Sequence, residues 1–97
     1  MTVAELRNLL TDCSRVWGVD ARITEQDAVL RLIGDEGTFE VWPAPEELRP
    51  VRWFLQTPER RNANRPPRAV PSVVAMLSAL RNAMGVKSGS ALRVGGS

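Results

Sequence analysis

The residues best suited to chemistry lie in the segment PERRNANRPPRAVP, residues 58–71, which holds four arginines, two asparagines and four prolines. Guanidinium groups bind carboxylates and phosphates bidentately, and asparagine amides both donate and accept hydrogen bonds. The prolines equally favour an extended, partly polyproline II connector whose arginines stay in solvent or pair with acidic residues. A protein contact surface, a nucleic-acid contact surface and a plain connector therefore all stay open. The polar residues concerned are Arg60, Arg61, Asn62, Asn64, Arg65 and Arg68.

Three tryptophans and no tyrosine stand in the chain, so each tryptophan matters for recognition. The spacing of Trp17 along a helix and of Trp53 along a strand predicts that both belong to the core. Trp42 alternates with apolar neighbours and falls on the other face of its strand, beside Arg52 and Phe54 if the sheet forms as expected. An exposed tryptophan there would anchor a partner or stack on a base. The alternative is that the proline loop or the connector covers Trp42.

Residue types that support catalysis are scarce. The chain has no histidine, which removes the commonest general base and zinc ligand. The acidic pairs at 35–36 and 46–47 are explained by a turn and by a helix start, and neighbours in sequence do not aim at one point. The lone cysteine, Cys13, falls on an apolar helix stripe, and no phosphate-binding glycine loop occurs. We therefore expect no catalytic residue, no metal and no cofactor.

Length and charge limit the class of protein. A chain of 97 residues with 43% hydrophobic and 25% charged residues is typical of one small globular domain. No apolar run reaches the roughly 18–20 residues that cross a bilayer, and a single cysteine fits a reducing compartment, so we expect a cytosolic protein of bacterial type. The net charge of +2 hides an acidic half, residues 1–50, and a basic half, residues 51–97. That asymmetry indicates either a basic face for an anionic partner or two halves that attract each other.

The N-terminal segment predicts an amphipathic helix. Thr2 followed by Glu5 is a capping box, and Gly18 supplies a left-handed stop. Apolar residues recur at helical spacing between these signals, so one face should be buried. The stripe comprises Val3, Leu6, Leu10, Cys13 and Trp17, broadened by Leu9 and Val16.

The middle of the chain predicts antiparallel strands. Residues 19–33 favour two short strands around a polar turn, although capping and stop signals also permit a short helix at 25–33. Residues 38–42 alternate as a half-buried strand, 45–47 suit one helical turn, and 51–57 alternate again. We expect the segments 38–42 and 51–57 to pair.

A second helix is predicted from about residue 72 to residue 84. Its main stripe comprises Val73, Leu77, Leu80 and Met84, with Val74 and Met76 beside it. A helix this apolar needs cover on more than one side, which favours a homodimer formed through it. Gly85 and Val86 form a Schellman-type end, and residues 87–97 have too little apolar content to pack, so we expect a disordered tail.

These elements predict an α+β fold of two layers: an N-terminal helix, a small antiparallel sheet of three or four strands and a C-terminal helix. Residues 1–86 would form a single domain, with 58–71 as a connector loop and 87–97 as the tail. The function expected is that of a small non-catalytic binding or adaptor protein, docking onto a protein partner through the arginine loop and the sheet face. The alternative is an RNA- or DNA-binding protein that uses the same loop with aromatic stacking. No membrane partner is expected.

Overall fold

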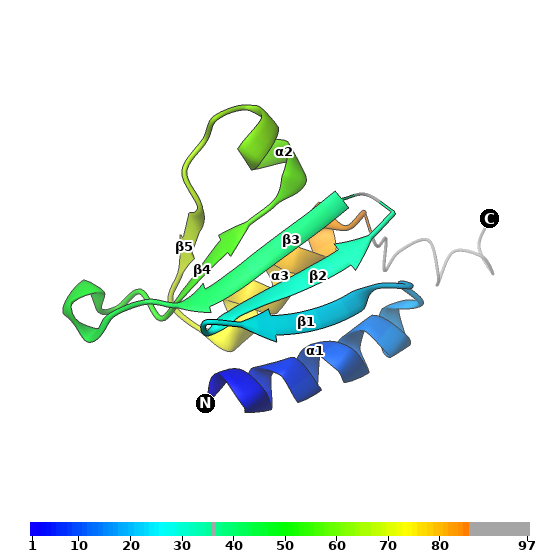
Figure 1. Ribbon diagram of the computed structural model, residues 1–97. Helices are drawn as coiled ribbons and strands as arrows, with labels where there is room; N and C mark the ends of the chain where they lie inside the picture. Colours follow the sequence, from blue (N-terminus) through cyan, green and yellow to red (C-terminus); the bar gives the residue numbers. More distant parts are fainter. Residues whose placement is uncertain (36, 86–97) are drawn as a thin grey trace, which may run out of the picture.

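The computed structural model describes residues 1–35 and 37–85, and it shows a two-layer α+β fold (Figure 1). Five strands form one antiparallel sheet in the order β1-β2-β3-β4-β5, so every strand pairs with the next one in sequence. The long helices α1 (Val3–Trp17) and α3 (Val73–Ala83) pack on one face of this sheet. The prediction of an α+β fold is confirmed, but the predicted number of strands is too small by at least one. In the described part of the chain, no helix has the length and apolar character needed to span a membrane.

Helix α1 (Val3–Trp17) begins and ends at its predicted signals. The Thr2 backbone N–H donates to Glu5 Oε1 at 2.8 Å, and the Glu5 N–H donates to Thr2 Oγ1 at 3.1 Å. The first of these hydrogen bonds is the main reason that the pKa of the Glu5 carboxyl is lowered. Gly18 ends the helix with φ +71°, a backbone conformation that suits glycine.

The buried face of α1 runs through Leu6, Leu10 and Ser14, with Trp17 half-buried at the end. It is narrower than predicted, because Cys13 is only half-buried and Val16 keeps 84% of its surface exposed. One helix on a small sheet buries about one stripe, so positions at the margin of the apolar pattern stay in solvent.

Residues 22–34 form a hairpin of β1 (Arg22–Gln26) and β2 (Val29–Gly34). Asp27 and Ala28 connect the strands with φ of +53° and +65°, the geometry of a tight two-residue hairpin turn. Gln26 pairs directly with Val29 across this turn. The prediction of strands is confirmed, and the alternative of a helix at 25–33 is wrong.

The remaining strands continue the meander. Strand β3 (Gly37–Pro43) pairs with β2 and with β4 (Trp53–Gln56), as predicted, and the single turn of 3-10 helix η1 (Glu46–Leu48) lies between β3 and β4. The additional strand is β5 (Arg68–Val70), which pairs with β4. It was not predicted because it is three residues long and lies among prolines, which have no backbone donor for a sheet.

The core lies between the sheet and the two long helices. Strand residues that face the helices alternate with residues that face away, and the first set is almost fully buried. Trp53 belongs to the core, as predicted, with 6% of its surface exposed. The buried apolar residues are Leu6, Leu10, Leu30, Leu32, Phe39, Val41, Trp53, Leu55, Val70, Met76, Ala79 and Leu80.

Helix α3 (Val73–Ala83) begins at the cap residue Ser72, whose Oγ accepts from the Ala75 N–H. Its buried face is Met76, Ala79 and Leu80. Of the predicted main stripe, Leu80 is buried, whereas Val73, Leu77 and Met84 are half-buried at the sides. Val74 is the one large apolar residue of α3 classed as exposed, at 75%.

The sheet therefore covers the face of α3 that holds Met76, Ala79 and Leu80, and Val74 stays exposed. Self-association stays a prediction that light scattering would check, and a mass of one chain would remove it. The predicted stop at Val86 and the predicted tail at 87–97 lie outside the described residues.

Candidate functional site

The sheet face opposite α1 and α3 is called the open face here, and it carries the aromatic residues singled out in the sequence. Trp42 on β3 is paired directly with Phe54 on β4, with ring centroids 5.7 Å apart and planes tilted by 31°. Both side chains are half-buried, and Ala69 on β5 lies opposite Phe54 without covering it. The sequence left open whether Trp42 is exposed or covered, and the structure shows it half-buried. None of the described residues on the open face is fully buried. The open-face residues are Arg22, Thr24, Gln26, Val29, Arg31, Ile33, Thr38, Glu40, Trp42, Phe54, Gln56 and Ala69.

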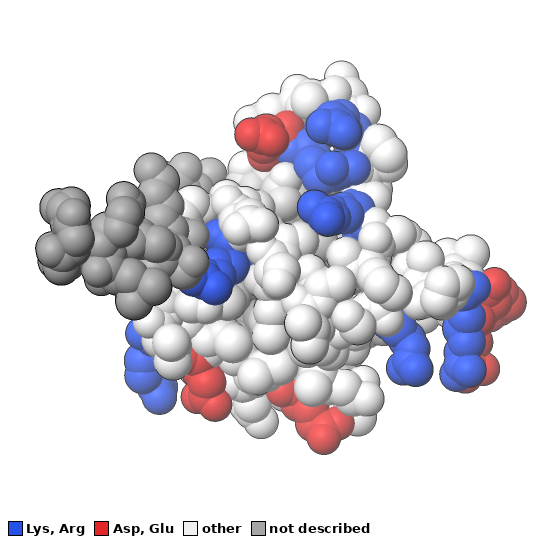
Figure 2. All heavy atoms as spheres, turned by 180° about the vertical axis from the view of Figure 1, so that it is seen from behind, with Lys and Arg blue, Asp and Glu red and all other residues white. Residues whose placement is uncertain are grey.

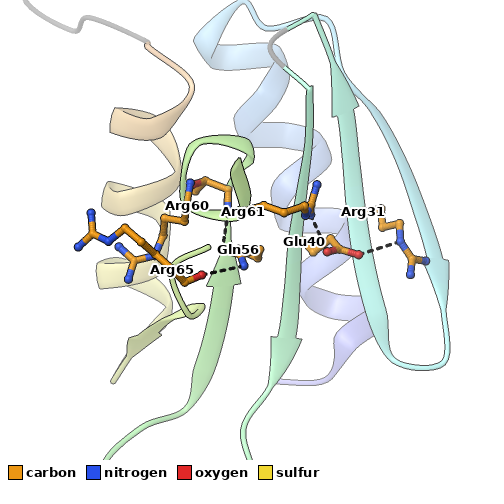
Figure 3. A network of polar contacts seen from close by, with 7 residues as sticks. Arg31, Glu40, Gln56, Arg60, Arg61 and Arg65 are labelled. Atoms are coloured by element: carbon orange, nitrogen blue, oxygen red, sulfur yellow. Dashed lines mark hydrogen bonds and ion pairs between the residues drawn. The ribbon is translucent and has the colours of Figure 1, made fainter. Parts of the chain in front are cut away.

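Two residues before Trp42, on the same face, Glu40 binds two arginines. Arg61 donates through an Nη atom to Glu40 Oε1 at 2.7 Å, and Arg31 donates through Nε to Glu40 Oε2 at 3.0 Å (Figure 3). Only 23% of the Glu40 side chain is exposed, against 38% for Arg31 and 44% for Arg61. One carboxylate thus ties the arginine segment to the sheet and leaves one positive charge in excess.

The arginine segment, for which an extended connector was one of three open alternatives, begins with a short helix, α2 (Pro58–Asn62). Thr57 caps the helix by accepting from the Arg60 N–H at 3.1 Å, and Pro58 occupies the first turn, where a missing N–H costs nothing. The signals were present in the sequence, but the later prolines suggested an extended chain. Asn64 then reverses the chain with φ +57°.

The four arginines of the segment do not share one surface. Arg61 points to Glu40, whereas Arg60 and Arg65 point away from it in Figure 3, toward the side of α3. Arg60 Nε donates to the Pro66 carbonyl at 2.9 Å, and the Arg65 carbonyl accepts from the Gln56 amide at 3.4 Å. These two contacts hold the segment in a closed loop.

Arg68 lies two residues before the buried Val70 on β5, so both side chains face the helix side of the sheet. From behind the sheet as drawn in Figure 1, basic side chains gather over the projection that contains α2 (Figure 2). Asn62, Arg60 and Arg68 line a groove on that side. The predicted site is therefore divided between two faces.

Arg52 is the predicted site residue that lies apart from the others. It precedes β4, is exposed and lines a groove at the end of the sheet together with Pro43, Pro45 and Val73. Its backbone bonds to Val70 and Ala44 extend the sheet there. Arg52 is thus not paired with Trp42 across the strands, because the register places Phe54 opposite Trp42.

Arg31 is a site residue that the sequence analysis missed. Gly34 pairs with Gly37 across the β2–β3 turn, so residues equally far from the turn face each other. Arg31 and Glu40 are each three positions from these glycines and are directly paired. Opposite charges at matched distances from a hairpin turn were the signal that would have found the pair.

Comparison of the chain with protein-family models, with curated proteins and with solved structures found no match. The class of protein that can be stated is thus a two-layer α+β domain with one open sheet face. A function has to be inferred from the surfaces of the chain itself.

Proposed function

We propose that this protein is a small non-catalytic adaptor that docks onto a protein partner through the open face of its sheet. The observation that carries the proposal is the half-buried pair of Trp42 and Phe54, whose rings stay partly accessible on adjacent strands. A folded chain normally covers large aromatic rings, and tryptophan is enriched among the residues that dominate binding energy at protein interfaces.

The surroundings of the aromatic pair suit a protein partner. Val29 and Ile33 on β2 add half-buried apolar surface to the same face. Glu40 and its two arginines lie beside the pair as a polar margin with defined hydrogen bonds. An apolar centre with a charged rim is the usual anatomy of a protein interface.

Nucleic-acid binding is the alternative, and the positions of the arginines favour it less. Stacking and phosphate contacts have to act on one strand at the same time. Arg60 and Arg68 line the groove on the helix side, and Arg65 points away from Glu40 in Figure 3. Arg61 is engaged by Glu40. A nucleic acid on the open face would therefore meet few free guanidinium groups.

The experiment is partner capture from the host cell, followed by calorimetry with the purified partner. Trp42→Ala and Phe54→Ala should each weaken binding by about 2 kcal/mol, or about 30-fold in Kd, if the pair is the centre of the interface. Val16→Ala is the matched control, since it removes an apolar side chain that is 84% exposed on the helix layer. It should change Kd less than about twofold.

Equal affinity of Trp42→Ala and the parent protein would refute the docking surface. Binding of labelled single-stranded RNA or DNA that weakens steeply between about 50 and 200 mM salt would replace the proposal by the nucleic-acid alternative. Circular dichroism of each variant separates loss of contact from loss of fold.

A further inference from the structure

A groove of about 750 Å³ lies on the helix side of the molecule, away from the open face. Helix α2 contacts β3, whereas α3 contacts β4 and β5, and the groove is the space between α2 and the end of α3. Its accessible apolar surface comes from Pro58, Ala63 and Ala83, whereas Phe39, Leu55 and Ala79 lie buried at its base.

Two arginines supply positive charge to this groove. Arg60 comes from α2 and Arg68 from β5, and both line it. The bond from Arg60 Nε to the Pro66 carbonyl fixes the guanidinium and uses only one of its donors. Within the described residues, no carboxylate lies within 4.0 Å of either guanidinium, although Glu59 also lines the groove. The groove thus combines an apolar wall with guanidinium donors that have no acidic partner there.

We propose that this groove binds a short acidic segment of a protein partner, with carboxylates on Arg60 and Arg68 and an apolar side chain against Pro58 and Ala83. The groove is lined by two arginines and one glutamate, so charge complementarity favours a negatively charged ligand. A free phosphate would leave the apolar wall of the groove without a contact, so the wall favours a larger ligand that also carries an apolar group.

Other occupants fit less well. A nucleic acid needs an accessible ring for stacking, but the aromatic residue of the groove, Phe39, is only 2% exposed. Residues 86–97 of this chain contain Lys87 and Arg93 and no aspartate or glutamate, so their side chains do not complement the arginines. The groove also lies on a different face from Trp42 and Phe54, so the inference stands independently of the proposed function.

The test is selection of displayed random twelve-residue peptides on the immobilised full chain, followed by fluorescence anisotropy with the enriched peptides. We expect enriched sequences in which aspartate or glutamate lies within a few residues of an aliphatic side chain. The double variant Arg60→Ala/Arg68→Ala should weaken a selected peptide at least about tenfold, which corresponds to 1.4 kcal/mol. The control Arg7→Ala/Arg15→Ala removes the same charge from two exposed positions on α1 and should leave the affinity within about twofold.

A second variant tests the same groove in case the double variant does not fold. Ala83→Glu adds a carboxylate at an exposed position of the groove and should weaken the same peptide about tenfold by like-charge repulsion. The inference is overturned by the absence of any enriched peptide, by enriched peptides without acidic residues, or by equal losses in the two double variants. It is also overturned if a labelled single-stranded oligonucleotide binds in the groove more tightly than the peptides.

Discussion

Replacing Glu40 by glutamine removes one negative charge from between two arginines while preserving the shape of the side chain. The bonds at risk are those from Arg61 at 2.7 Å and from Arg31 at 3.0 Å. Since between 23% and 44% of each side chain is exposed, solvent screens the charges and each pair contributes about 0.5–1 kcal/mol. Glu40→Gln should therefore lower the free energy of unfolding by about 1–2 kcal/mol. Each kcal/mol lost should lower Tm by about 4–8 °C.

Urea and thermal unfolding followed by tryptophan fluorescence measure this loss. The difference between Glu40→Gln and the parent protein should shrink in about 1 M salt, where the screening length falls to about 3 Å. Glu47→Gln is the matched control, because Glu47 is exposed and has no ion pair among the described residues, and its effect should stay within about 0.5 kcal/mol. A double-mutant cycle with Arg61→Ala should give a coupling of about 0.5–1 kcal/mol. Equal stability of Glu40→Gln and Glu47→Gln, or a loss that salt does not reduce, would refute the ion-pair account.

Two further predictions concern Gly37, at the turn between β2 and β3, and the thiol of Cys13. Gly37→Ala places a Cβ 2.9 Å from Pro58 Cγ at a φ of +122°, so it should destabilise more than Gly18→Ala, whose Cβ meets nothing within 4 Å. Urea midpoints compare the two variants, and equal losses would show that contact with Pro58 is unimportant. Burial, and then the charge of Asp12, raise the pKa of the Cys13 thiol, so less thiolate is present at a given pH. Iodoacetamide should alkylate Cys13 more slowly at pH 8 than it alkylates N-acetylcysteine, and Asp12→Asn should raise the rate; an unchanged rate would exclude the charge as a cause.

Much of the architecture was predictable because its signals are local. Thr2, Glu5 and Gly18 mark the ends of α1 through hydrogen bonds and a backbone conformation that act within one turn. The alternation of apolar and polar residues around Trp42 and Phe54 likewise predicted which face each ring occupies. Strand β5 was missed because three residues between prolines carry no alternation long enough to recognise.

The candidate site was only partly predictable. The sequence showed four arginines close together, but sequence proximity does not determine where long side chains point. The cap at Thr57 starts a helical turn that sends Arg61 toward the open face, while Arg60 turns back to the Pro66 carbonyl. Pairing with β4 then places Arg68 on the helix side.

The sequence by itself determined the residue types available for binding, the two long helices and the strand face on which Trp42 lies, because propensity, capping and alternation act over a few residues. Only the tertiary structure decided that the arginine segment faces two ways. Glu40 lies 21 positions from Arg61, and their 2.7 Å contact exists only because the sheet register brings β3 beneath α2. The segment 58–71 is thus neither a plain connector nor a single basic arm, since one arginine anchors it to the sheet and two others line a groove.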